Sequence, residues 1–316
     1  LSSRGQACIF AGTDPTSAAN WSLVATFDMD PPISRRCMTR VGSDLGIITQ
    51  SGVLPISTAL PFDPSADRSI AITARIQNAM ATVTSQYATN FGWQFITFPA
   101  QNLALLNVPL SQNVLQQQYV MNALTGAWCR FTGWNANCFE IYNEDLYFGG
   151  NDGTVNLAYT GGLDLNTPIA AEMQCAFNYF DDPGRLKRVT MVQPLMVASG
   201  TITPTISIDE DFATSTSTAT VSLITGGAQW GSGLWDVSVW PPLTQVNNPW
   251  LSTLAIGHAL AVHLNVNVSP QTLLSNVGEF DIGVFDTAQF DQTVSNIAPT
   301  LQINAFNAIL EYGGFI

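Results

Sequence analysis

The chain has 316 residues, and its ten Lys and Arg against 23 Asp and Glu give a net charge of −13. Charged residues make up only 10% of the chain, compared with about 25% in an ordinary globular protein. The acidity argues against holding nucleic acid by phosphate neutralisation, which needs clustered Lys and Arg. It is compatible with a channel that DNA passes through without sticking. The length is sufficient for two domains with sizeable cores.

Short strands are predicted throughout the first half of the chain from its alternating and apolar segments. We expect them at 6–12, 21–27, 37–41, 46–50, 52–57, 92–99, 103–108, 118–124, 128–131, 138–142, 145–149 and 154–159. One helix is expected near 68–86, because Ile72, Ile76 and Met80 recur every four residues among alanines. This half is therefore predicted to be all-β with a single helix.

A hairpin pattern occurs twice in this half, at an offset of 101 residues. In both copies, a glycine at the end of a turn supplies the positive φ that a tight hairpin needs. A four-stranded repeat of about 50 residues is typical of β-propeller blades, although a meander in any large all-β protein can match it by chance. The identical positions are Cys37 and Cys138, Asp44 and Asp145, Leu45 and Leu146, and Gly52 and Gly153.

The pattern changes near residue 163. Beyond it, strands are longer and alternate more regularly, as in 202–208, 259–268 and 301–312. Long alternating strands separated by Gly, Pro and Asn turns are typical of a β-sandwich. We therefore predict two domains, with residues 1–163 as the C-terminal blades of a partial β-propeller and residues 164–316 as a β-sandwich.

Neither a membrane segment nor a secretion signal is predicted. No stretch reaches the ~20 apolar residues that span a bilayer, and the chain opens with Leu1-Ser2-Ser3-Arg4 rather than a leader. Because residues 7–11 already have strand character, we expect this chain to be the C-terminal part of a longer protein. The five cysteines form no CxxC pair. Free buried thiols, suited to a reducing cytoplasm, are therefore favoured over a Cys129–Cys138 bridge.

Two acidic groups are candidates for a calcium site or a catalytic carboxylate pair. Asp209-Glu210-Asp211 is the densest run, but neighbouring residues of an extended chain point to opposite faces, which favours a polar turn. Asp281, Asp286 and Asp291 each follow a phenylalanine, and their five-residue step in a strand does not ensure that the carboxylates converge. A solvated edge or a subunit contact is favoured there, so no metal or cofactor is predicted.

His258 and His263 are the only histidines of the chain. In a regular strand their spacing points them to opposite faces, so a shared metal is not predicted. A Ser-His-Asp triad is not predicted either, since the chain has no Gly-x-Ser-x-Gly elbow. The glycine-rich segment 149–153 joins two strands, whereas a phosphate-binding loop opens a helix. The chain is predicted not to be an enzyme.

Arg185, Lys187 and Arg188 form the one basic cluster. The cluster is either a contact for DNA or an acidic neighbouring subunit, or a solvated loop after residues 181–184. The sequence does not decide between these alternatives. Half of the eight tryptophans lie among Gly, Asn and Pro, where they are expected to anchor loops against neighbouring subunits rather than stack on sugars. They are Trp230, Trp235, Trp240 and Trp250.

Short segments along most of the chain share motifs with one family. They are 12–15, 21–22, 41–45, Gly52-Val53-Leu54-Pro55-Ile56-Ser57, 142–153, 169–177, 187–188 and 303–314. These segments resemble the podovirus tail nozzle proteins, also called tail tubular protein B, and the related packaged-DNA stabilisation proteins. The first five look like propeller strands of that family, and the last three look like its platform domain.

The resemblance implies a fold, a role and partners. Residues 164–316 would be the family's β-sandwich platform domain, following the propeller blades. The protein would be a structural subunit of a phage tail nozzle, a head-to-tail connector in which six copies retain packaged DNA and conduct it during ejection. Its partners would be an adaptor ring, tail fibres or spikes, and double-stranded DNA in passage. It would be assembled in the host cytoplasm into the virion, with no cofactor and no membrane insertion.

A second class of protein stays open at this point. A virion-associated propeller could bind carbohydrate or degrade polysaccharide, using Asp209, Glu210 or the tryptophan-rich loop. It would need a concave pocket with two carboxylates about 5–10 Å apart beside an aromatic platform. The nozzle instead predicts a cyclic oligomer with acidic groups facing an axial channel. A secreted propeller scaffold is a third, less favoured class, because bridged cysteines are not predicted.

Overall fold

The protein is all-β, as predicted, with several antiparallel sheets and few helices. The chain divides into two compact units, Leu1–Thr160 and Gly161–Ile316. None of the described sheets closes into a barrel, and no described helix is long and apolar enough to cross a bilayer. The computed structural model describes residues 1–60, 68–160, 163–164, 167–198, 202–215, 217–221, 245–268, 271–276, 292–297 and 301–315.

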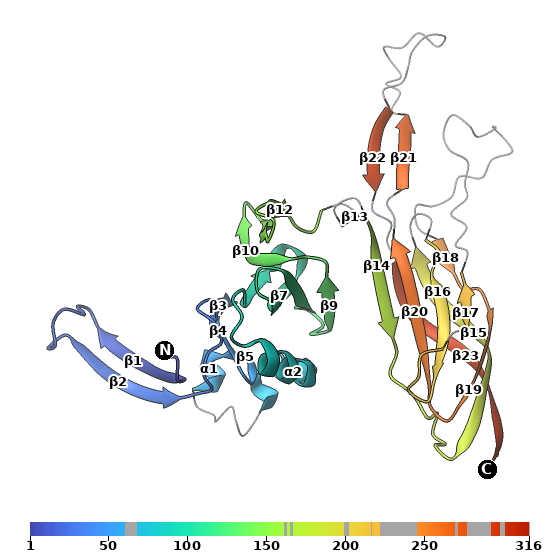
Figure 1. The fold of residues 1–316 in the computed structure, drawn as a ribbon, viewed down its shortest axis with the longest axis horizontal. Coiled ribbons are helices and arrows are strands. Elements are labelled where there is room, and N and C mark those ends of the chain that lie inside the picture. The colour runs from blue at the N-terminus through green and yellow to red at the C-terminus, as the bar shows by residue number, and fades with distance from the viewer. Residues whose placement is uncertain are drawn as a thin grey trace, which may run out of the picture. The chain divides into compact units, whose positions relative to one another are not determined.

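The first unit contains four antiparallel sheets with strand orders β1-β2, β3-β4-β5, β6-β7-β8-β9 and β10-β11-β12 (Figure 1). Every strand predicted here is present, with ends that differ by three residues at most. The strands are β1 (Gln6–Gly12), β2 (Trp21–Asp28), β3 (Met38–Val41), β4 (Asp44–Thr49), β5 (Gly52–Pro55), β6 (Gln94–Phe98), β7 (Leu103–Ser111), β8 (Leu115–Asn122), β9 (Trp128–Thr132), β10 (Ala136–Tyr142), β11 (Asp145–Gly150) and β12 (Val155–Leu157). The helices are α1 (Ile56–Ala59) and α2 (Gln77–Tyr87), with 3₁₀ turns at Arg68–Ile70, Ala74–Ile76 and Pro99–Gln101.

The helix predicted near 68–86 is regular only in its second half, as α2. In the first half, the backbone N–H of Ile72 donates to the carbonyl of Val53 at 2.9 Å. The hydroxyl of Thr73 accepts the N–H of Val53 at 3.1 Å. Because these bonds tie the chain to the edge of β5, the segment before α2 cannot close helical hydrogen bonds of its own and forms only short 3₁₀ turns.

The two hairpins of the 101-residue repeat are present as predicted. Strands β4 and β5 are joined by a tight turn that leads into Gly52, the first residue of β5, at φ +125°, and β11 and β12 are joined through Gly153 at φ +84°. Both hairpins belong to three-stranded sheets, β3-β4-β5 and β10-β11-β12. The guanidinium of Arg36 also donates to the carbonyl of Asn137 at 3.4 Å. Position 36 of the first copy thus contacts its own counterpart in the second.

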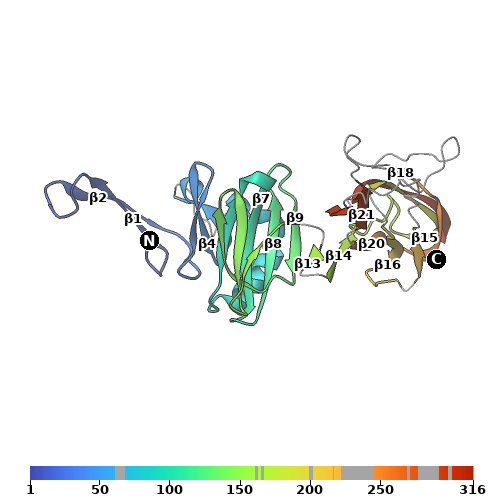
Figure 2. The same ribbon diagram turned by 90° about the horizontal axis from the view of Figure 1, so that it is seen from above.

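One half-buried and one buried amide side chain join the four-stranded sheet, in which β7, β8 and β9 lie side by side (Figure 2), to the sheet that follows it. The Gln94 amide on β6 donates to the carbonyl of Phe139 on β10 at 2.8 Å and accepts its N–H at 2.9 Å. Asn107 is fully buried and donates to the carbonyls of Gly92 and Ala136. The Gln94 amide thus bonds to the backbone of Phe139 as a neighbouring strand would. It connects the two sheets where no backbone–backbone hydrogen bonds within the described residues do so.

The described part of the second unit has three antiparallel sheets, of which two surround one core and the third pairs β21 with β22. The first has the strand order β13-β14-β20-β16-β17, and in the second, β15 lies between β23 on one side and β18 and β19 on the other. Buried residues from β15, β16, β19 and β20 form the shared core. The strands are β13 (Leu163–Asp164), β14 (Thr167–Gln174), β15 (Arg185–Ala198), β16 (Thr205–Glu210), β17 (Thr218–Thr220), β18 (Gln245–Asn247), β19 (Leu251–Gly257), β20 (Leu260–Val268), β21 (Gln271–Asn276), β22 (Gln292–Ile297) and β23 (Leu301–Phe315).

Strand β14 lies outside this core. All eight of its side chains are exposed, including Ile169 at 42% and Met173 at 38%. Its pairing with β13 involves only Thr167 and Pro168. The second unit therefore leaves one strand exposed on both faces, with most of its outer edge unpaired within the described residues.

Candidate functional site

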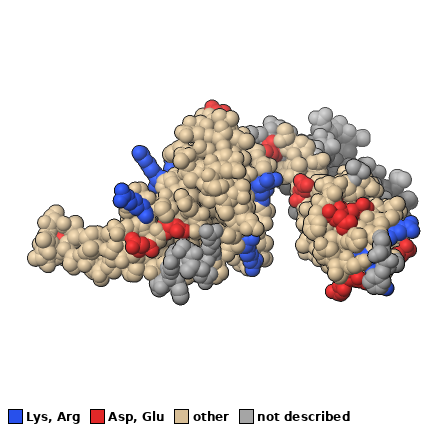
Figure 3. All heavy atoms as spheres, turned by 60° about the horizontal axis from the view of Figure 1, so that its bottom comes forward, with Lys and Arg blue, Asp and Glu red and all other residues tan. Residues whose placement is uncertain are grey.

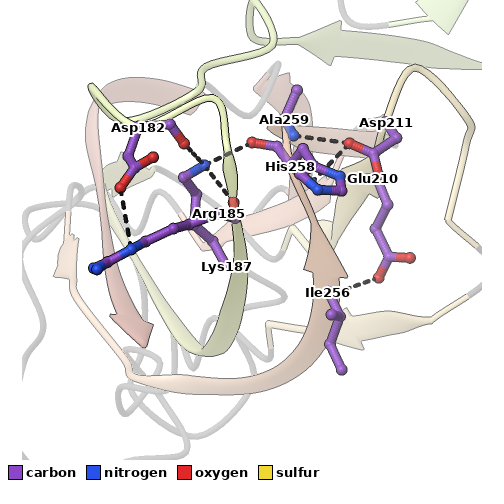
Figure 4. Close-up of polar contacts among 8 residues, drawn as sticks. All are labelled: Asp182, Arg185, Lys187, Glu210, Asp211, Ile256, His258 and Ala259. Carbon is purple, nitrogen blue, oxygen red and sulfur yellow. Dashed lines mark hydrogen bonds and ion pairs between the residues drawn. The ribbon is translucent and has the colours of Figure 1, made fainter. Parts of the chain in front are cut away.

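The basic cluster of the sequence does not form one surface patch. Lys187 is fully buried, and its ammonium donates to the carbonyls of Arg185 and His258 at 2.9 Å each and to that of Asp182 (Figure 4). The sequence left Lys187 open as a contact residue or as part of a solvated loop, and its burial fits neither alternative. A buried ammonium needs such partners because dehydration of a charge is costly, and here the partners are backbone carbonyls.

Arg185 and Arg188 keep partial exposure but are tied to carboxylates of their own unit. The guanidinium of Arg185 lies 3.5 Å from Asp182, and that of Arg188 lies 3.7 Å from Glu311. Alternation along β15 places Arg188, which is exposed, on the face opposite to buried Lys187. Of the three predicted contact residues, only these two arginines can reach a partner.

The acidic run anchors the turn that joins β19 to β20. The Asp211 carboxylate accepts the backbone N–H groups of His258 and Ala259, both at 2.8 Å. The N–H of Ala259, then that of His258 and its nearby imidazole, hold the pKa of the Asp211 carboxyl below its ordinary value. Glu210 accepts the N–H of Ile256 at 2.8 Å (Figure 4). Carboxylates therefore accept N–H groups of this turn and of the end of β19, while the Lys187 ammonium donates to the carbonyl of His258 in the turn.

The first residue of the run is buried and faces a histidine. Asp209 is fully buried, and its carboxylate lies 3.1 Å from Nδ1 of His263. Nε2 of the same imidazole lies 2.8 Å from the exposed carboxylate of Glu172. Since the two carboxylates approach opposite nitrogens, they do not converge on one point. Within the described residues, no group of three or more His, Cys, Asp or Glu side chains could hold a metal ion.

The polar turn predicted at the acidic run begins one or two residues later than expected. Asp209 and Glu210 still belong to β16, and the turn is formed by Asp211 at φ +46° and Phe212 at φ +67°. Two backbone hydrogen bonds between Glu210 and Ala213, at 3.1 and 2.8 Å, close it. Phe212 is 67% exposed, and the centroid of its ring lies 4.5 Å from that of the Phe177 ring.

Sequence reasoning missed that both histidines meet the acidic run. His258, which was placed in a strand, lies in the turn before β20, with its imidazole 3.7 Å from Asp211. His263 pairs with Ser207 across β16 and β20, which brings it diagonally to Asp209. Only the strand register reveals this contact, and the register follows from pairing partners distant in sequence.

The remaining candidates are only partly described. Trp250 is 45% exposed, whereas Trp230, Trp235, Trp240, Asp281, Asp286 and Asp291 lie outside the described residues. All five cysteines are free, as predicted, and no Cys129–Cys138 bridge forms. Burial was predicted for all five but holds only for Cys37, since Cys8 and Cys129 are exposed and the other two are half-buried.

No protein-family model and no curated protein matches this chain. Its function must therefore be argued from its own geometry. The described part of the second unit offers anchored charges and exposed aromatic rings at one end and an uncovered strand elsewhere. Such features suit contact between proteins.

Proposed function

We propose that the protein is a structural subunit of a bacteriophage tail nozzle, a head-to-tail connector that retains packaged DNA and conducts it during ejection. In this proposal, the sheets from β3 to β12 are successive blades of a β-propeller and the second unit is a β-sandwich platform domain. The observation that carries the proposal is the 101-residue repeat. Its two copies form similar three-stranded sheets, β3-β4-β5 and β10-β11-β12. In the sequence, the four-stranded sheet of β6 to β9 lies between them.

Uncovered surfaces support a subunit of an assembly. Strand β14 exposes both faces, and the β1–β2 ribbon exposes Ile9, Phe10, Leu23 and Val24 at 39 to 62%. An isolated two-stranded ribbon is marginally stable in water, and exposed apolar patches mark interaction sites. Neighbouring chains in a homo-oligomer, proposed to be a hexamer, would cover such surfaces, as would an adaptor ring and tail fibres or spikes.

The charge of the chain supports the same role. A net charge of −13 disfavours adsorption of DNA, because like charges repel across a water-filled channel. A conduit for double-stranded DNA needs this property, since a basic lining would retain the duplex. We place the assembled protein in the virion, after assembly in the host cytoplasm.

The carbohydrate-directed alternative lacks an observation that favours it. Asp209, one of its proposed carboxylates, is fully buried against His263. Glu210 is engaged by the N–H of Ile256.

Electron microscopy of native complexes tests the proposal. The expected result is a six-fold ring with an open axial channel. A monomer, or a trimer with a closed centre, would refute it. As a second measurement, the assembled ring should not retain linear double-stranded DNA at physiological salt, and tight retention would contradict a free conduit.

A further inference from the structure

The aromatic residue of the turn that ends β16 is held in an unfavourable backbone conformation. Phe212 has φ +67°, a region that bulky residues rarely adopt. Asn-Gly and Asp-Gly are the usual pairs in such two-residue turns, and here phenylalanine stands where glycine is expected. The Phe212 side chain is 67% exposed, so burial in the core of its own unit does not offset the strain. Strain of this kind collects at functional positions.

The rest of the turn is held firmly. Asp211 accepts two N–H groups of the β19–β20 turn, and Glu210 accepts the N–H of Ile256 near the end of β19. The ring of Phe177 supports that of Phe212 from one side at 4.5 Å. The aromatic side chain is thus presented outward in a fixed position beside two carboxylates. Pre-organised aromatic residues of this kind are typical anchors of protein–protein interfaces.

The distribution of charge between the two units indicates which surface binds the Phe212 turn. Residues 161–316 contain 13 of the 23 Asp and Glu but only three of the ten Lys and Arg, while residues 1–160 contain the other seven. Acidic groups gather on one face of the second unit (Figure 3). Arg35, Arg36 and Arg40 of the first unit are exposed, and none has a carboxylate within ion-pair distance among the described residues. The guanidinium of Arg36 lies 5.4 Å from the centre of the Phe91 ring, an arginine–aromatic contact within the chain itself.

We infer that the Phe212 turn, residues Glu210–Ala213, is an assembly contact that binds the exposed arginines Arg35, Arg36 and Arg40 of a second copy of this chain. The aromatic ring stacks on a guanidinium, and the neighbouring carboxylates complement its charge. Because each copy carries both halves of the contact at different places, the contact is heterologous and can propagate from copy to copy. The inference rests on the proposed function in one respect, that copies of the chain assemble.

The first test distinguishes a role of the Phe212 side chain in self-association from a role in the stability of the fold. Phe212→Gly removes the ring and relieves the strain, so we expect self-association to weaken at least tenfold in sedimentation or native mass spectrometry, without a lower thermal midpoint. Glu144→Gly is the matched control, because Glu144 holds the same position, at φ +68°, in the turn between β10 and β11. It should leave assembly unchanged. If F212G lowers the midpoint and assembles like the wild type, Phe212 is a structural residue and the inference is wrong.

The second test identifies the partner surface. At a concentration where R35Q/R36Q and F212G are each monomeric, their mixture should form one-to-one dimers, since the intact turn of one variant meets the intact arginines of the other. A mixture that stays monomeric would overturn the pairing. A six-fold ring insensitive to F212G refutes this inference alone. An oligomer without six-fold symmetry that F212G dissolves refutes the nozzle alone.

Discussion

Replacement of the buried ammonium tests the best-defined polar cluster of the second unit. Lys187→Met keeps the length and apolar character of the side chain but removes the donor to three carbonyls. Each lost bond to a charged donor costs about 1.5–3 kcal/mol. Several kcal/mol are recovered because the ammonium need not be dehydrated. We expect a net loss of about 3 kcal/mol in the free energy of unfolding, within the range for loss of a buried charged partner.

Urea unfolding, followed by circular dichroism and by hydrogen exchange of the β15 and β19–β20 peptides, measures this loss. With a slope of about 2–3 kcal/mol per molar urea, the midpoint should fall by about 1–1.5 M. Arg188→Met is the control: it removes the same charge one residue further along, where the pair with Glu311 is more than half exposed, and should cost less than about 0.5 kcal/mol. Equal stability of K187M and wild type would refute the reasoning that the ammonium holds these carbonyls.

Three further predictions concern the acidic turn, the repeat and the thiols. Because the pKa of Asp211 is lowered in the fold, its stabilisation is complete above the ordinary carboxyl value of about 4 and is lost as the pH falls through the lower folded value. Unfolding free energies of D211N and wild type should therefore differ at pH 7 and converge in acid, and a constant difference would contradict this. A Cβ at Gly52 would overlap a threonine hydroxyl, whereas at Gly153 it meets nothing within 4 Å; G52A should cost about 3 kcal/mol and G153A about 1 kcal/mol in chemical unfolding. Iodoacetamide should label exposed Cys8 well before buried Cys37, whose thiol pKa is raised by burial, and mass spectrometry of the tryptic peptides would expose the reverse order.

Local pattern was sufficient for the strands. Alternation and glycine turns act within a few residues, so β1 and β20 are found almost to the residue, as are the hairpins at Gly52 and Gly153. The helix near 68–86 was half wrong because its first turns bond to Val53, a contact that helix periodicity does not encode.

The polar cluster could not be predicted in the same way. Lys187 was grouped with its arginine neighbours by sequence, but a bulge and the alternation of β15 place it inside the unit. One of its three carbonyl partners, that of His258, lies 71 residues away. A basic run in the sequence therefore gives the charge of the residues but not which of them water can reach.

The contact between Arg36 and Asn137 has a geometric consequence for the repeat. When two copies of a motif are related by a rotation, their equivalent positions lie near each other only close to the rotation axis. Positions 36 and 137 are equivalent, and Arg36 donates a hydrogen bond to Asn137. They therefore mark where such a rotation axis would pass through the first unit. Any internal pseudosymmetry of this unit should therefore be sought around that arginine rather than around the centre of the longest sheet.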